Sequence, residues 1–233
     1  EDSKDYIAGF PSHPHRGIET VTYMLAGEFE HKDSTGGEGR MTAGDVQWMK
    51  TGSGIIHSEM PAMKEGKLHG FQLWINMPSC LKMSKPEYHY IDANEMSVHH
   101  DEDKKVKVIA GKFENAEGPI KKHNVEPIFF DVELKQNKQF SFSIPKSHNS
   151  FVYLVDGRIK IGNLSHDNIE GSKLVLLTNG NNLKVSAETN AKFLLIAGEP
   201  IGESIARGGP FVMNTKSEII QAINDYNNGT FVR

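Results

Sequence analysis

The chain has 233 residues, with 26 Lys and Arg against 30 Asp and Glu, so its formal net charge is −4 when histidine is neutral. This acidic balance argues against a protein that holds nucleic acid by phosphate neutralisation alone. No run of 18 apolar residues occurs, so a membrane-spanning helix is not expected. The single cysteine, Cys80, excludes an intramolecular disulfide and a cysteine-cluster zinc site.

Short β-branched and aromatic runs, separated by glycine and proline turns, predict a strand-rich protein. The predicted strands cover residues 20–25, 45–49, 70–76, 127–134, 150–154 and 193–197. Short strands at this spacing are typical of β-sandwiches and barrels. Thr215 and Glu218 have the spacing of a capping box, and apolar residues follow them at helical intervals. We therefore expect a helix near the C-terminus that packs on a sheet.

A weak internal repeat indicates two halves. Residues 23–27 (YMLAG) resemble residues 153–157 (YLVDG), and residues 71–75 loosely resemble residues 192–196. The charged stretch 92–103 lies between the halves and is a candidate linker. We therefore expect two related β-domains, residues 1–100 and residues 101–233.

Two pairs of side chains with metal-binding chemistry share the same spacing. His13 and His15 precede the first predicted strand, and His57 and Glu59 follow the second. Residues i and i+2 of an extended chain point to the same face, so neighbouring strands could gather three imidazoles and one carboxylate around one point. That set suits a divalent first-row metal and leaves positions open for substrate or O₂. A single His-x-His segment in a sequence is more often a hydrogen-bonded pair on the protein surface than a metal site. That alternative stays open.

The other chemically interesting residues receive less specific predictions. Histidines outside the pairs are expected to be surface or hydrogen-bonded residues: His31, His69, His89, His123 and His166. For Arg16, a structural salt bridge is favoured over contact with an anionic substrate. Trp48 and Trp74 are expected in the core, although either could line a pocket. Gln47 could face the interior as a polar residue or point to the opposite face.

Taken together, these motifs resemble the pirin family of the cupin superfamily. The matching segments are residues 13–21, 45–49, 57–61, 69–74, 196–200 and 209–215. The resemblance implies an all-β bicupin, with two tandem cupin (jelly-roll-like) β-barrels and a short C-terminal helix. Members of the family usually carry a further N-terminal segment, which the domain of residues 1–100 is expected to lack.

The resemblance also implies one divalent transition metal in the N-terminal cupin. Its ligands would be His13, His15, His57 and Glu59, with Fe(II) as the first expectation and Mn, Ni, Cu or Zn as alternatives. In many other cupins the glutamate of the first motif, here Glu19, is the carboxylate ligand. The pirin assignment gives that role to Glu59, and Glu19 is expected to form a hydrogen bond nearby.

The second half is expected to lack a metal site. An offset of 130 residues aligns His13, His15 and Glu19 with Ser143, Pro145 and Asn149, which do not replace the ligand set. Residues 101–233 are therefore expected to form a cupin-like domain without metal ligands.

The function implied by the resemblance is that of a metal-dependent dioxygenase of the quercetin 2,3-dioxygenase type. It would cleave a flavonol with O₂ and release carbon monoxide, and Glu59 would take the flavonol proton as general base. The alternative is a metal- or redox-responsive transcriptional co-regulator, or a regulatory protein that binds an enzyme. A third interpretation is a cupin whose metal only stabilises the fold.

The expected partners and location follow from the same resemblance. The partners are a small aromatic substrate and O₂, with a protein partner open and with no direct nucleic acid or membrane contact. The expected location is the cytoplasm, and also the nucleus if the source is eukaryotic.

Overall fold

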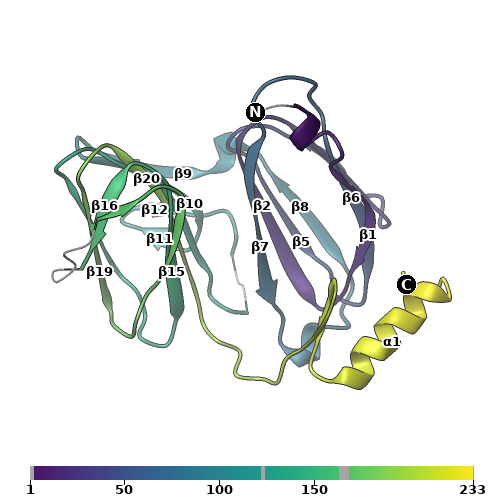
Figure 1. Cartoon of the computed structure of the whole chain (residues 1–233). Coiled ribbons are helices and arrows are strands. Elements are labelled where there is room, and N and C mark those ends of the chain that lie inside the picture. The colour runs from purple at the N-terminus through teal and green to yellow at the C-terminus, as the bar shows by residue number, and fades with distance from the viewer. Residues whose placement is uncertain (1–2, 122–123, 163–167, 233) are drawn as a thin grey trace. The chain divides into compact units, whose positions relative to one another are not determined.

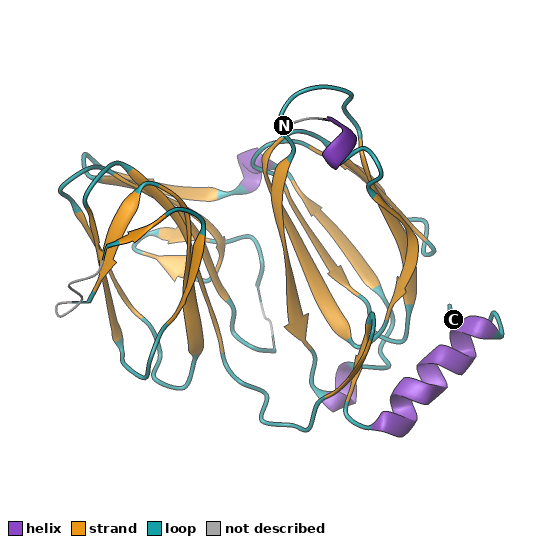
Figure 2. Cartoon of the chain, in the orientation of Figure 1, coloured by secondary structure: helices purple, strands orange, loops and turns teal. Residues whose placement is uncertain are grey.

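Strands dominate the protein, as Figure 2 shows for this computed structural model. The structure describes residues 3–121, 124–162 and 168–232. The one α-helix among these residues is α1 (Lys216–Asn227), near the C-terminus. The prediction of an all-β fold with a short C-terminal helix is confirmed. Within the described residues, no helix has the length and apolar character needed to span a membrane.

The chain divides into two compact units, and the C-terminal segment belongs to the first. One unit comprises Glu1–Ala93 with Ile201–Arg233, and the other comprises Asn94–Pro200. This differs from the expected division at residue 100, because the chain returns to the first unit after Pro200. The internal repeat could not reveal this return, since the returning segment has no counterpart in the first half of the sequence.

The first unit contains two four-stranded antiparallel sheets, with strand orders β1-β6-β3-β4 and β7-β2-β5-β8 (Figure 1). The strands of these sheets are β1 (Phe10–His15), β2 (Ile18–Ala26), β3 (Phe29–Asp33), β4 (Glu38–Met41), β5 (Val46–Lys50), β6 (Ile55–Pro61), β7 (His69–Asn76) and β8 (Glu87–Ile91). The smaller elements of this unit are η1 (Ser3–Asp5), η2 (Ser79–Leu81), β21 (Ala206–Gly208) and β22 (Phe211–Met213). Alternate residues of β6, namely Ile55, His57 and Glu59, are buried. This period of two shows that one face of β6 points to the interior.

The second unit has a six-stranded sheet, β18-β15-β20-β13-β10-β9, and a four-stranded sheet, β14-β19-β16-β17. The strands of this unit are β9 (Ser97–His100), β10 (Lys104–Ala110), β11 (Lys112–Phe113), β12 (Ala116–Glu117), β13 (Ile128–Leu134), β14 (Gln139–Ser143), β15 (Asn149–Asp156), β16 (Arg158–Ile161), β17 (Ile169–Glu170), β18 (Lys173–Leu176), β19 (Asn182–Ala187) and β20 (Ala191–Gly198). The short 3₁₀ helix η3 (Ala93–Glu95) lies at the boundary between the units. Side chains from both sheets form one apolar core, which includes Phe130, Phe140 and Phe193.

The sequence repeat marks equivalent strands in the two units. The first repeated segment covers the end of β2 in one unit and the end of β15 in the other. Gly27 and Gly157 follow these strands directly and have φ angles of +83° and +87°. Glycine adopts this left-handed conformation without a steric penalty, so both strands turn at the same place. β2 pairs with β7 and β15 pairs with β20, which accounts for the second repeated segment.

A buried ion pair attaches α1 to the strand that carries the first histidine pair. Arg16 Nη1 donates to Asp225 Oδ2 at 2.7 Å, and Arg16 Nε donates to the carbonyl of Ser53 at 2.6 Å. The guanidinium carbon lies 4.4 Å from the centroid of the Phe231 ring. At the start of α1, Thr215 and Glu218 form the predicted capping box. The structural salt bridge predicted for Arg16 is thus present, and it holds the C-terminal segment on the first unit.

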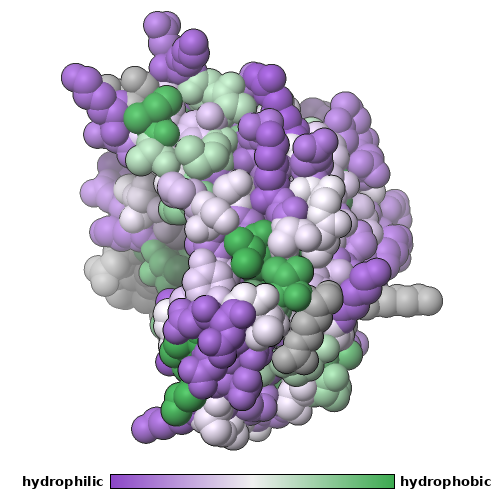
Figure 3. Space-filling view, turned by 90° about the vertical axis from the view of Figure 1, so that its right-hand side faces the viewer, coloured by the Kyte–Doolittle hydropathy of each residue, from purple (hydrophilic) through white to green (hydrophobic). Residues whose placement is uncertain are grey.

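Apolar side chains are scattered over the face that Figure 3 presents, in small groups between hydrophilic ones. The exposed apolar residues of α1 are Ile220, Ile223 and Tyr226. Scattered apolar residues of this kind are ordinary on protein surfaces.

We expect Asp225→Ala to lower the free energy of unfolding of the first unit by about 3–5 kcal/mol, because it leaves the Arg16 charge buried without its partner. Urea denaturation followed by tryptophan fluorescence reports on this unit, since Trp48 and Trp74 both lie in it. The control is Glu30→Ala, which breaks the exposed pair of Glu30 with Lys32 in the same unit and should cost less than about 1 kcal/mol. Equal losses for the two variants would contradict the role of the buried pair.

Candidate metal centre

The pairing of β1 with β6 brings three histidines together. His13 lies opposite His57 across the two strands, and His15 shares the face of His13 two residues along β1. The ring centroids of the three imidazoles lie 4.3–5.1 Å apart. One nitrogen atom from each ring lies within 4.8 Å of the other two. The structure therefore brings together the three imidazoles that the sequence pairs suggested.

Hydrogen bonds turn the Nε2 atoms of these histidines toward a common point. His13 Nδ1 lies 2.8 Å from the carbonyl of Pro11, and His15 Nδ1 lies 3.3 Å from the carbonyl of Pro210. A carbonyl only accepts, so both Nδ1 atoms carry the proton and both Nε2 atoms keep a lone pair. His15 Nε2 is buried without a hydrogen-bond partner among the described residues, and His13 Nε2 lies 2.9 Å from His57 Nε2. A divalent cation fits this arrangement, because it would satisfy lone pairs that otherwise face one another.

Glu59 lies beside this cluster and is held by neutral donors. It is 2% exposed and accepts from Thr22 Oγ1 at 3.1 Å, Gln47 Nε2 at 3.3 Å and Gln72 Nε2 at 2.7 Å. A carboxylate oxygen of Glu59 lies within 4.8 Å of ligand atoms of His31 and His57. His13 and His15 form a second group of this kind, and His57 is the member that both groups share. The four-residue ligand set therefore stays a prediction.

Side chains from the facing sheet complete the site. Thr22 lies in register with Gln47 on one side and Gln72 on the other, which makes a polar row across β5, β2 and β7. Of the two orientations considered for Gln47, the structure shows the inward one, with the side chain fully buried. The Trp74 ring meets the His15 ring edge-on at 5.1 Å and is half-buried, so Trp74 lines the site.

Two further residues outside the predicted ligand set have simple structural roles. Trp48 is 3% exposed, and its Nε1 donates to Glu19 Oε2 at 2.7 Å. The expectation of a core position for Trp48 and of a nearby hydrogen bond for Glu19 is confirmed.

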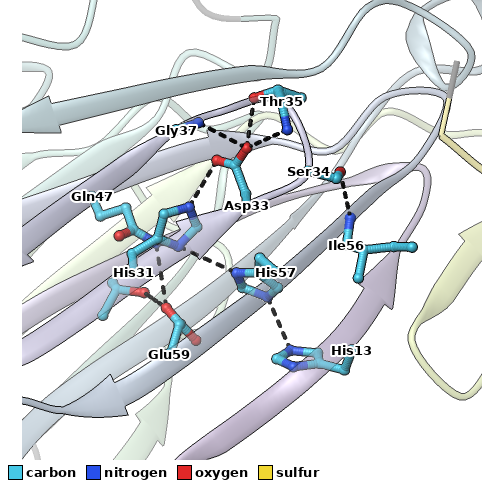
Figure 4. A network of polar contacts seen from close by, with 11 residues as sticks. His13, His31, Asp33, Ser34, Thr35, Gly37, Gln47, Ile56, His57 and Glu59 are labelled. Atoms are coloured by element: carbon cyan, nitrogen blue, oxygen red, sulfur yellow. Dashed lines mark hydrogen bonds and ion pairs between the residues drawn. The ribbon is translucent and has the colours of Figure 1, made fainter.

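The strand on the other side of β6 adds a pair that the sequence analysis missed. His31 of β3 lies opposite Glu59, and Asp33 lies opposite His57. His31 is fully buried, with Nε2 at 2.9 Å from Asp33 Oδ2 and Nδ1 at 3.4 Å from His57 Nδ1 (Figure 4). His31 is thus hydrogen-bonded as expected, but it is not isolated. The signal was present as His31-Lys32-Asp33, a third pair with i, i+2 spacing.

Among the described residues, no other histidine belongs to these groups of candidate ligands. The side chain of His89 is 57% exposed and faces Glu87, and His69 is half-buried. His123 and His166 lie outside the described residues. In the second unit, the positions aligned with the first motif are exposed: Ser143, Pro145 and Asn149.

Burial keeps His15 and His57 neutral. Loss of solvent, reinforced by the neighbouring His13, lowers the pKa of His15 from 6.5 to about 4. Burial and then the three neighbouring imidazoles lower the pKa of His57 still further. Neutral imidazole is the form that binds metal, so the site is ready for a cation at neutral pH.

Family profiles and known proteins match this chain in sequence. The Pirin family profile matches residues 1–75, and the Pirin C-terminal cupin domain profile matches residues 129–232. A pirin-like protein of Caulobacter vibrioides is 42% identical over 99% of this chain and 83% of its own length. A Vibrio cholerae protein provisionally named quercetin 2,3-dioxygenase is also 42% identical, with the same coverage.

The fold has a close match among solved structures. A crystal structure of quercetin 2,3-dioxygenase from Acinetobacter baumannii superposes with a TM-score of 0.90 at 37% identity, covering 96% of this chain and 79% of that one. The fold and the histidine cluster define a protein of two cupin domains with a candidate metal centre in the first unit, which confirms the predicted fold class. The chain belongs to the pirin family.

We expect the metal-free protein to lose stability as the pH falls from 6.5 toward 4. His15 and His57 take up protons in the unfolded chain below 6.5 but stay neutral in the fold, so unfolding binds protons and acid favours it. Each histidine contributes a slope of about 1.4 kcal/mol per pH unit in this range. Urea unfolding between pH 7.5 and pH 5 measures it.

Two variants separate this effect from general acid destabilisation. His57→Gln should remove one histidine's share of the slope. The control Asn224→Gln, at an exposed residue of α1 that does not titrate, should leave the slope unchanged. A wild-type free energy of unfolding that stays flat down to pH 5 would contradict the assignment.

Proposed function

We propose that this protein is a metal-dependent dioxygenase that cleaves flavonols. The observation that carries the proposal is the cluster of His13, His15 and His57, together with the buried carboxylate of Glu59, which groups with His57. The similarity to proteins named quercetin 2,3-dioxygenase supports the same reaction class. In this proposal the substrates are a small aromatic flavonol and O₂.

The proposed ligands are His13, His15, His57 and Glu59, and the proposed metal is Fe(II). Imidazole and carboxylate ligands with open positions are typical of non-haem iron oxygenases, although Mn, Ni, Cu and Zn accept similar ligands. The carbonyls of Pro11 and Pro210 fix the rings of His13 and His15 so that Nε2 faces the metal. When bound, the divalent metal would supply positive charge that stabilises the flavonolate anion and activates it for reaction with O₂.

Glu59 is the proposed general base for the 3-hydroxyl of the flavonol. The hydrogen-bond donors to it within the described residues are the neutral side chains of Thr22, Gln47 and Gln72. These donors hold the carboxylate in place while one oxygen takes the proton. The Trp74 ring beside His15 offers an apolar wall for a planar aromatic substrate. In the balanced reaction both atoms of O₂ enter the ring-opened ester product, and one carbon of the flavonol leaves as carbon monoxide.

We expect protein of known metal content to convert quercetin under air with release of carbon monoxide. His13→Ala should lose both the metal and the turnover, because it removes one imidazole of the cluster. The matched control is His100→Ala, an exposed histidine of β9 in the second unit, which should keep both. Metal analysis, quercetin absorbance and carbon monoxide detection measure these outcomes.

A fully metallated protein that leaves quercetin unchanged would contradict the flavonol proposal. The co-regulator alternative would then be tested by partner capture with the iron in each oxidation state.

We expect Glu59→Gln to keep the fold and to lower kcat by about 10²–10⁴-fold, because the amide cannot take the flavonol proton. The control is Glu19→Gln, which neutralises another buried carboxylate of the same unit and should leave kcat close to that of the wild type. Steady-state kinetics at matched metal content make the comparison. Turnover by Glu59→Gln at the wild-type rate would remove Glu59 as the base.

A further inference from the structure

A continuous series of hydrogen bonds runs from the β3–β4 turn to the histidine cluster (Figure 4). Asp33 Oδ1 accepts from Thr35 N at 2.7 Å, Thr35 Oγ1 at 2.6 Å and Gly37 N at 3.1 Å. The other oxygen, Oδ2, accepts from His31 Nε2 at 2.9 Å. The turn therefore fixes the Asp33 carboxylate, and the carboxylate places the His31 proton on Nε2.

Gln47 shows independently that His31 Nδ1 is an acceptor. The Gln47 Nε2 atom lies 3.3 Å from Glu59 Oε1 and 3.1 Å from His31 Nδ1. The Glu59 carboxylate accepts only, so this end of the Gln47 side chain is the amide nitrogen, and its second proton points to His31. His31 consequently carries its proton on Nε2 and its lone pair on Nδ1.

The proton of His57 follows from this assignment. His57 Nδ1 lies 3.4 Å from the acceptor His31 Nδ1, so the proton of His57 is on Nδ1. The lone pair of His57 is then on Nε2, which faces His13 Nε2 at 2.9 Å. His31 also stacks on the Tyr88 ring, with centroids 4.5 Å apart and planes 11° apart, which prevents the His31 ring from turning.

We infer that Asp33 and His31 form a positioning pair that holds His57 in its metal-binding tautomer. The inference rests on the proposed metal site and extends it by one layer. Carboxylates and carbonyls bonded to the far nitrogen of a ligating histidine commonly do this directly. Here the carboxylate acts through a second imidazole, whereas His13 and His15 use backbone carbonyls.

The decisive variant is Asp33→Asn. Asparagine can keep an oxygen for the bonds from Thr35 and Gly37, but it then presents an N–H group to His31 Nε2. The proton of His31 would move to Nδ1, where it meets the donors of Gln47 and His57. His57 could relieve that conflict only by carrying its proton on Nε2, which removes the lone pair that the metal needs. We expect the affinity for Zn²⁺ to fall about 10–100-fold, as measured by competition with a chromophoric chelator.

Two more variants separate positioning from general damage to the turn. Ser34→Ala removes a bond of the same turn, to Ile56 N, but leaves every bond of Asp33 in place, so zinc affinity should stay close to that of the wild type. His31→Phe keeps an aromatic ring next to Tyr88 and removes both nitrogens, and it should weaken zinc binding by itself. Adding Asp33→Asn to His31→Phe should then have no further effect, because Asp33 acts only through the imidazole.

Ring ¹⁵N NMR of the zinc-loaded wild type gives a readout independent of affinity. We expect His31 as the Nε2–H tautomer with an unprotonated Nδ1. An Nδ1–H tautomer, an Asp33→Asn variant with wild-type zinc affinity, or an undiminished effect of Asp33→Asn in the His31→Phe background would each overturn the inference.

The outcomes also separate this inference from the proposed function. Weakened zinc binding by Asp33→Asn in a protein that never converts quercetin would contradict the dioxygenase proposal alone. A wild-type protein that binds no zinc would overturn the metal site and the positioning pair together.

Discussion

The antiparallel register of β6 between β1 and β3 is the constraint on which the candidate site depends. It sets His13 opposite His57 on one side, and His31 opposite Glu59 with Asp33 opposite His57 on the other. A slip of one residue between β1 and β6 would turn His13 and His15 away from His57. A slip of one residue between β3 and β6 would do the same to His31 and Asp33. The backbone ladder thus fixes the chemistry, because three short i, i+2 pairs share one buried face.

The C-terminal segment, residues 201–233, helps to hold β1 in place although it belongs to neither of the two sheets. The carbonyl of Pro210 orients His15, and the next residue, Arg16, is paired with Asp225 of α1. Lys82 is 1% exposed, and its Nζ donates to the carbonyls of Gly17 and Val212. The segment therefore holds β1 at the end where its histidines lie. Damage to α1 should for that reason affect the metal site as well as stability.

The two units fill their interiors with different kinds of side chain. The face of β6 carries imidazoles and a carboxylate, whereas β14 and its neighbours bury phenylalanines, with Phe140 stacked on Phe113 at 5.5 Å and edge-on to Phe193. Close packing is enough to stabilise an apolar core. A polar interior also needs a hydrogen-bond partner for every buried donor and acceptor. The polar interior therefore has a more demanding geometry, and it is the interior suited to ligands.

The sequence by itself determined the strands β2, β5, β7, β13, β15 and β20, the capping box at Thr215 and the two residue pairs that supply three imidazoles. Strand periodicity and cap chemistry are local, so a sequence pattern can reveal them. The sequence did not determine that His31 and Asp33 join the cluster, or that Glu59 groups with His31 and His57 rather than with all three predicted histidine ligands. Those facts depend on which strands become neighbours and in which register. Long-range pairing decides both, and no local pattern in a single chain encodes it.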